Sequence, residues 1–297
     1  MEYYFNRLEK IMRALIKRRG LEKVLLNGTL SITCKELYNS STVMILTGFY
    51  ISGANAAEND GPLGTASLAA ALEKIGKRVV VVTDDNCKEV VNSCMKLMEV
   101  KGNIEVVPGL GDAKFYSDLL EKYKPSHIVS IERPGRAVDD EYYNMNGIKL
   151  TDYVADCDVL FVMAQEMGIV TIAVGDGGNE IGMGNIENYI KKYVENGEKI
   201  CAKSTCDYLI LAGTSNWGAY AIVSGLSLLS NKNIFHDNNI EIRMLKKVIS
   251  VGGVDGYIGK PGMTIDGIKL SYNIQQLDNF NSIVESYLSL NRDNVVL

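Results

Sequence analysis

Short apolar runs that alternate with helix-patterned segments constrain the fold of this chain more than any other sequence feature. The clearest run is RVVVVT at 78–83, which is β-branched and apolar on both faces. Strands of this kind are typical of parallel sheets that are covered by helices on both sides. Comparable runs occupy 43–47, 104–107, 127–131, 170–174 and 208–212. The pattern therefore predicts about six buried strands.

The segments between these runs favour helices. Helices are predicted over 63–75, 88–100, 113–123, 149–163 and 219–229, and Pro62 suits a first helical turn because its missing N–H would be unpaired there. An amphipathic helix is predicted over 1–20, a loop over 230–239, irregular structure over 252–267 and a last helix near 279–290. The predicted fold class is α/β, a three-layer sandwich with a mostly parallel, Rossmann-like sheet and an irregular C-terminal subregion.

The length and composition indicate one globular unit. The chain has 297 residues, of which 46% are apolar, so we expect a single α/β domain over 1–297 with a peripheral C-terminal subregion over 230–297. A net charge of −5 does not favour nucleic acid as a partner. The sequence has no run of about 18 apolar residues, so no membrane span is predicted.

The N-terminus and the cysteines bear on localisation. The first 20 residues are charged and contain no apolar signal-peptide core, and the basic run at 17–19 is interpreted as a solvated helix end. The six cysteines are scattered and form no C-x-x-C pair, which indicates reduced thiols. We therefore expect a cytoplasmic protein. Its expected partner is a small acidic metabolite, and the sequence leaves open whether the chain forms a homo-oligomer.

Acidic residues follow the predicted strands. They are Glu58 and Asp60 after the first strand, Asp84 and Asp85 after the second, Glu132 after 127–131, and Asp176 and Glu180 after 170–174. In an open parallel sheet all strand C-termini lie on one edge, where ligands bind. The pattern therefore predicts an acidic rim, although each carboxylate alone is equally compatible with a helix cap or a surface charge.

Carboxylates that lie close together need raised pKa values or a bound cation. Ligand sets made of oxygen alone favour Mg²⁺ or Mn²⁺, and the candidate metal ligands are Glu58, Asp60, Glu132 and Asp176. The chain has two histidines, one opening a strand and one in a polar loop, so histidine-based zinc chemistry and a Ser-His-Asp triad are not favoured. A carboxylate is therefore the expected general base.

The glycine-rich segment 175–184 follows a strand and lets the backbone approach a ligand closely. It is not a Walker A loop, because no Lys-Ser or Lys-Thr follows its glycines. A second cluster, Gly109-Leu-Gly111, resembles a dinucleotide fingerprint, but Lys114 stands where the third glycine belongs. No nucleotide cofactor is therefore expected.

Two arginines and one polar turn lie at the same predicted edge. Arg133 and Arg136 suit the capture of a carboxylate or phosphate, and salt bridges to neighbouring carboxylates are an equal alternative. Ser215, Asn216 and Trp217 precede a predicted helix, where free N–H groups favour an anion. Trp217 is either a wall of the pocket or part of the core.

Several sequence blocks resemble the signature blocks of the D-glutamate cyclase-like C-terminal domain family, over residues 18–229. They are TGF at 47–49, ENDGP at 58–62, VTD at 82–84, IERPGR at 131–136, YNM at 143–145, GDGGNEIGMG at 175–184 and SNWGA at 215–219. The resemblance implies a carbon–oxygen lyase that closes D-glutamate to 5-oxo-D-proline with loss of water. Asn59 departs from the family pattern, which often has threonine there.

The resemblance also implies roles for individual residues. The expected catalytic residues are Asp176, Glu180, Glu132 and Arg133, and a divalent ion held by the four candidate ligands would polarise the γ-carboxyl group. The expected substrate contacts are Arg136, Asn179, Asn144, Ser215, Asn216, Trp217 and Thr83. A Mg²⁺- or Mn²⁺-dependent phosphohydrolase of small phosphate esters and a non-catalytic binding protein for an acidic metabolite are the alternatives.

Overall fold

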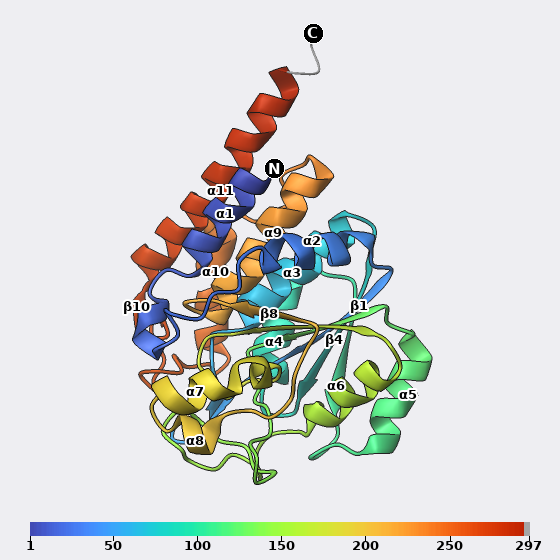
Figure 1. Cartoon of the computed structure of the whole chain (residues 1–297), viewed down its shortest axis with the longest axis vertical. Helices are drawn as coiled ribbons and strands as arrows, with labels where there is room; N and C mark the ends of the chain where they lie inside the picture. Colours follow the sequence, from blue (N-terminus) through green and yellow to red (C-terminus); the bar gives the residue numbers. More distant parts are fainter. Residues whose placement is uncertain (294–297) are drawn as a thin grey trace.

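The computed structural model describes residues 1–293, and over this range the core is a sheet of six parallel strands (Figure 1). The strand order is β5-β4-β1-β6-β7-β8, and every neighbouring pair is parallel. The strands are β1 (Thr42–Thr47), β4 (Arg78–Asp84), β5 (Asn103–Val107), β6 (His127–Ile131), β7 (Val170–Gly175) and β8 (Tyr208–Leu211). The predicted α/β class and the parallel sheet are confirmed.

The two faces of the sheet carry separate apolar cores, because successive strand residues point to opposite sides. Val79 and Val81 face one core, while Val80 and Val82 face the other. The first core is covered by α1 (Glu2–Met12), α2 (Thr29–Asn39), α3 (Pro62–Lys74), α4 (Lys88–Leu97), α9 (Ser215–Ser230), α10 (Asn238–Ser250) and α11 (Leu270–Asp293). The second core is covered by α5 (Ala113–Tyr123) and α6 (Cys157–Glu166), and helices pack on both faces as the three-layer prediction requires.

Several helix boundaries differ from the predictions. The helix expected over 149–163 is α6, which starts only at Cys157, because residues 150–155 form turns that pair with the 133–143 segment: the Leu150 N–H donates to the Tyr142 carbonyl, and the Arg133 guanidinium donates to the Ala155 carbonyl. Helix α9 begins at 215 and α11 at 270, both earlier than expected. The helices α2, α10, α7 (Glu187–Tyr193) and α8 (Gly197–Ile200) were not predicted.

The remaining elements are short and lie at the ends of the chain or at the edge of the sheet. The region expected as one N-terminal helix is α1 followed by the 3-10 helix η1 (Ile16–Arg19), and a second 3-10 helix, η2, spans Met183–Ile186. Two small hairpins, β2 (Tyr50–Ile51) with β3 (Ala56–Ala57) and β9 (Thr264–Ile265) with β10 (Ile268–Lys269), flank the carboxyl edge of the sheet. Helices α1 and α11 lie side by side (Figure 1).

The strand order reverses direction between β1 and β6. From β1 the chain builds outward through β4 and β5, and then returns to build β6, β7 and β8 on the other side. In such sheets the crevice for a ligand lies at this reversal, outside the carboxyl ends of the strands. Within residues 1–293, all six cysteines are free and buried, and no helix is both long enough and apolar enough to span a membrane.

Candidate functional site

A cavity of about 950 Å³ opens at the carboxyl edge of the sheet. Four buried carboxylates line it, those of Glu58, Glu132, Asp176 and Asp266, and they come from four separate parts of the chain; the exposed Glu195 lines it as well. The segments that bring them together follow β1, β6 and β7 or form the turn between β9 and β10. Of the predicted rim carboxylates, Glu58, Glu132 and Asp176 line this cavity at the strand-order reversal, whereas Asp84 is paired with Arg133 and Asp85 is exposed.

Asp60 lies beside this cavity and serves the start of α9. Its carboxylate accepts hydrogen bonds from the backbone N–H groups of Ser215 and Asn216, both at 2.8 Å, and from that of Gly61 at 3.1 Å. These N–H groups would otherwise be unpaired at a helix N-terminus, where a negative charge is favoured. Asp60 thus anchors the helix that follows β8, rather than capping the adjacent α3.

Asp176 and Glu180 come from the glycine-rich loop after β7 and have different surroundings. The Glu180 carboxylate accepts three backbone hydrogen bonds inside the loop, from the N–H groups of Asp176 (2.9 Å), Gly177 (2.7 Å) and Gly178 (2.6 Å). A Cβ at Gly177 would lie 3.3 Å from a Glu180 oxygen, so the glycine lets the loop close tightly around this carboxylate. Glu180 shapes the loop, and Asp176 is left to line the cavity.

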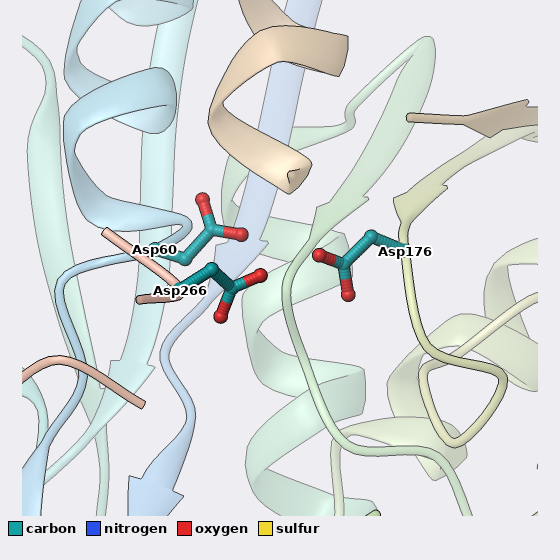
Figure 2. A group of neighbouring side chains, drawn as sticks. All are labelled: Asp60, Asp176 and Asp266. Atoms are coloured by element: carbon teal, nitrogen blue, oxygen red, sulfur yellow. The ribbon is translucent and has the colours of Figure 1, made fainter. Parts of the chain in front are cut away.

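Asp266 reaches the same place from the C-terminal third of the chain. It occupies the turn of the β9–β10 hairpin with φ +53°, and a glycine follows it. Figure 2 shows Asp60 and Asp266 on one side and Asp176 on the other, with their carboxylates turned toward one another. An oxygen of each lies within 4.8 Å of an oxygen of the others. Asp266 was not predicted as a site residue from the sequence, although its Asp-Gly pair is a hairpin signal.

Glu58 and Glu132 complete the acidic group. The Glu58 side chain is 5% exposed, and its Oε1 has no hydrogen-bond partner within the described part of the chain. Glu132 adopts φ +45°, and its Oε2 accepts a hydrogen bond from the Ser215 hydroxyl. Gly256 passes close to Glu58, since a Cβ there would lie 1.8 Å from Glu58 Oε2.

The electrostatics of the group follow from its burial. Burial raises the pKa values of Glu58, Glu132 and Asp176, and the neighbouring carboxylates raise them further. Burial, reinforced by the charge of Asp266, raises the pKa of Asp60 to about 8. Arg19 supplies positive charge, with Nη2 2.7 Å from Asp266 Oδ2 and 3.5 Å from Asp176 Oδ2. The basic run at 17–19 was interpreted as solvated, which is wrong for Arg19, whose side chain is 18% exposed.

The donor set fits a hard cation. Two groups of carboxylates are close enough to share an ion, namely Asp60, Asp176 and Asp266, and Glu132, Asp176 and Glu180. Asp60 in the first group and Glu180 in the second each accept three backbone hydrogen bonds. Asp176 belongs to both groups. The first group brings in Asp266, which lines the cavity, and it includes two of the four predicted ligands, Asp60 and Asp176.

Arg133, predicted as a catalytic residue, and Arg136, predicted as a substrate contact, have partners outside the cavity. Arg133 is fully buried and donates to Asp84 Oδ2 (2.6 Å) and to the carbonyls of Gly48 (3.1 Å) and Ala155 (2.6 Å). Arg136 forms an ion pair with Asp156. Both arginines thus form the salt bridges to neighbouring carboxylates that were the alternative to binding a carboxylate or phosphate ligand.

The predicted polar contacts divide into two sets. Asn144 and Asn179 line the cavity. Asn216 Oδ1 accepts from the N–H groups of Gly61 (3.0 Å) and Gly64 (2.7 Å), which ties α9 to α3. Trp217 is buried in the core and donates to Asn273 at 3.0 Å, and Thr83 donates to the Thr47 carbonyl at 2.9 Å. Trp217 is thus a core residue, the second of its two predicted alternatives.

Comparisons with known proteins show what this chain is similar to. A family model described as "D-glutamate cyclase-like, C-terminal" matches residues 8–281. The human protein "D-glutamate cyclase, mitochondrial" is 31% identical over 225 residues, which cover 71% of this chain and 36% of the human protein. The match therefore spans about a third of that relative's length. Among solved structures, E. coli tRNA N6-threonylcarbamoyladenosine dehydratase aligns with 74% of this chain and 96% of its own, with 10% identity and a TM-score of 0.33, too low to support any argument.

Proposed function

This chain belongs to the D-glutamate cyclase-like, C-terminal family, and from that premise we propose that it is a cation-dependent lyase that closes D-glutamate to 5-oxo-D-proline with loss of water. The human relative is named as a D-glutamate cyclase, and this name supports the proposed reaction class. Because the match covers 36% of that relative, the reaction is proposed for this chain on the chemistry of its own cavity.

One observation carries the proposal: carboxylates from distant segments converge in one cavity, and Glu58 Oε1 is buried there without a partner in the described residues. Buried carboxylates that are not paired with cations are costly, so their convergence favours a bound ion. Ligands made of oxygen alone favour Mg²⁺ or Mn²⁺. Asp60, Asp176 and Asp266 would hold the ion, with Glu58 and Glu132 at its side.

The reaction requires the substrate amine to attack its own γ-carboxyl carbon. A C–N bond forms and a C–O bond breaks, and two protons leave the nitrogen and end on the departing oxygen as water. A bound cation would polarise the γ-carboxyl group as a Lewis acid. Asp176 lines the cavity and would accept a proton from the amine. Burial raises the pKa of both Asp176 and Glu132, but the charge of Arg19 opposes the rise at Asp176, so Glu132 is the one that would donate to the leaving oxygen.

A phosphohydrolase is the rival from another reaction class, and the structure favours it less. The N-terminus of α9 would be the natural phosphate site, but its first N–H groups already donate to Asp60. Arg133 and Arg136, which suit phosphate capture, are paired with Asp84 and Asp156. A non-catalytic binding protein for an acidic metabolite is the third possibility. The assay below distinguishes it from both enzymes, because such a protein would bind its ligand without forming a product.

The test compares substrates with and without metal. Purified protein is incubated with D-glutamate, L-glutamate or an aryl phosphate, each with Mg²⁺, Mn²⁺ or a chelator, and 5-oxoproline and phosphate are measured. We expect 5-oxoproline from D-glutamate only when metal is present. Asp176→Asn should lower this rate by about 10²-fold or more, whereas the control Asp85→Asn, an exposed carboxylate beside Lys88, should not.

Three results would contradict the proposal. Full activity of Asp176→Asn would remove the assigned base, and phosphate release without 5-oxoproline would support the phosphohydrolase. Thermal stabilisation by D-glutamate with no product would instead identify a binding protein.

A further inference from the structure

Arg19 occupies a position that a cation would take in the acidic cavity. Its Nη2 contacts Asp266 Oδ2 at 2.7 Å and lies 3.5 Å from Asp176 Oδ2. Both aspartates belong to the group whose oxygens lie within 4.8 Å of one another. A divalent ion held by the same carboxylates would therefore place like charges within a few ångströms of the guanidinium group.

The guanidinium group of Arg19 is less enclosed than that of Arg133. The Arg19 side chain is 18% exposed and lines the cavity, whereas Arg133 is fully buried. Arg18 holds the hairpin separately, because its Nη2 donates to the Asp266 carbonyl at 2.8 Å and its guanidinium carbon lies 5.4 Å from the centre of the Tyr257 ring. The contact between the η1 segment and the hairpin thus has an anchor that does not use the Asp266 carboxylate.

We propose that Arg19 is an exchangeable counter-ion: a divalent cation displaces its guanidinium group from Asp176 and Asp266, and the freed group then binds the α-carboxylate of the amino-acid substrate. The second half rests on the proposed function. A guanidinium group is suited to a carboxylate through two parallel hydrogen bonds. Arg19 lines the cavity, whereas Arg133 and Arg136 are paired elsewhere. Binding is then ordered, with the cation first and the amino acid second.

The first arm of the test measures Mn²⁺ alone, by electron paramagnetic resonance of the free ion. Arg19→Gln removes the internal competitor, so we expect it to bind Mn²⁺ about tenfold more tightly than the wild type, the equivalent of one lost ion pair. Arg18→Gln is the matched control, because it removes a neighbouring arginine that contacts the Asp266 backbone rather than its carboxylate. We expect it to bind Mn²⁺ no more tightly than the wild type.

The second arm measures D-glutamate binding to the Mn²⁺-loaded proteins by calorimetry. We expect Arg19→Gln to bind D-glutamate at least about tenfold more weakly, and Arg19→Lys to recover part of the loss because it keeps the charge. In the wild type, the Nε resonance of Arg19 should shift on adding Mg²⁺ and again on adding D-glutamate. This NMR measurement decides the question even if the variants do not fold.

The proposal is overturned if Arg19→Gln binds Mn²⁺ no more tightly than the wild type, or if the Arg19 resonance does not respond to Mg²⁺. Equal D-glutamate affinity in loaded Arg19→Gln overturns the carboxylate half. If the wild type does not bind D-glutamate, the proposed function fails, and so does the proposed contact between Arg19 and the substrate carboxylate. The Mn²⁺ measurement still tests whether a cation displaces Arg19. Turnover of D-glutamate without tighter Mn²⁺ binding by Arg19→Gln leaves the proposed function standing alone.

Discussion

Replacing Asp176 with asparagine is expected to stabilise the metal-free protein while abolishing its function. Burial raises the pKa of Asp176, and the charges of Asp266 and Asp60 raise it further against the opposing effect of Arg19. A carboxyl group whose pKa is raised in the folded state favours folding at low pH, and this contribution is lost as the pH rises through the folded-state pKa. The neutral asparagine has no charge to bury, so its advantage over Asp176 should grow as the pH rises.

The magnitude follows from the linkage between pKa and stability. Each unit by which a pKa is raised costs about 1.4 kcal/mol when the group is ionised. Allowing for the lost contact with Arg19, we expect Asp176→Asn to be more stable than the wild type by about 1–3 kcal/mol at pH 8. Because protonation removes the charge of Asp176 as the pH falls, the difference should shrink towards pH 5.

Glu180→Gln is the comparison within the same loop and should act in the opposite direction. The Glu180 carboxylate accepts three backbone hydrogen bonds at 2.6–2.9 Å, and the amide presents only one accepting atom to them. Hydrogen bonds to charged groups contribute about 1.5–3 kcal/mol each, so we expect a loss of about 2–4 kcal/mol. This loss should persist at both pH values, because it comes from broken hydrogen bonds.

The assay is urea unfolding in the presence of a chelator at pH 5 and pH 8, with the slope checked for each variant. Each kcal/mol corresponds to a shift of about 2–4 °C in a parallel thermal scan. The reasoning is refuted if Asp176→Asn is less stable than the wild type at pH 8, or if Glu180→Gln unfolds at the same urea concentration as the wild type.

Two further variants test the assignments of neighbouring residues. Asp84→Asn leaves the fully buried Arg133 without its charged partner and should lower the free energy of unfolding by about 3–5 kcal/mol. The control Asp85→Asn changes an exposed carboxylate and should alter that free energy by less than about 0.5 kcal/mol. Equal urea midpoints for the two variants would contradict a structural role for the Arg133–Asp84 ion pair. Gly256→Ala places a Cβ 1.8 Å from Glu58 Oε2 and must displace that carboxylate, so Mn²⁺ affinity should fall about tenfold. Gly53→Ala, which has open space around the added Cβ, is the control, and an unchanged Mn²⁺ affinity in Gly256→Ala would exclude Glu58 from the cation site.

The strands and the acidic edge were predictable from sequence for a local reason. β-Branched apolar runs such as 78–83 carry their own signal, and a residue that directly follows a parallel strand must lie at the carboxyl edge. Glu58, Glu132 and Asp176 line the cavity on that basis alone. The roles of all predicted site residues remain predictions that the experiments above test.

The helix boundaries were less predictable, because tertiary contacts determine them. At the start of helix α9 the Trp217 N–H donates to the local cap Thr214, and the first two N–H groups donate to Asp60, at least 155 residues away in the sequence. Residues 150–155 stay non-helical because Tyr142 and the guanidinium group of Arg133 bind their backbone. A sequence window around either boundary contains neither Asp60 nor Arg133.

The sequence by itself determined the sheet, its edge and the presence of carboxylates there. Only the tertiary structure decided which carboxylate and which arginine complete the cavity. The Asp266 turn is a local feature, but its place beside Asp60 comes from the backbone pairing of Val254 with Ala57 and Asn59. Arg19 and Arg133 have the same chemistry, and burial alone separates them: folding encloses Arg133 with Asp84 and leaves Arg19 facing Asp176 and Asp266. The partner of a charged side chain depends on which opposite charges the fold brings within reach, and that distance is not encoded locally.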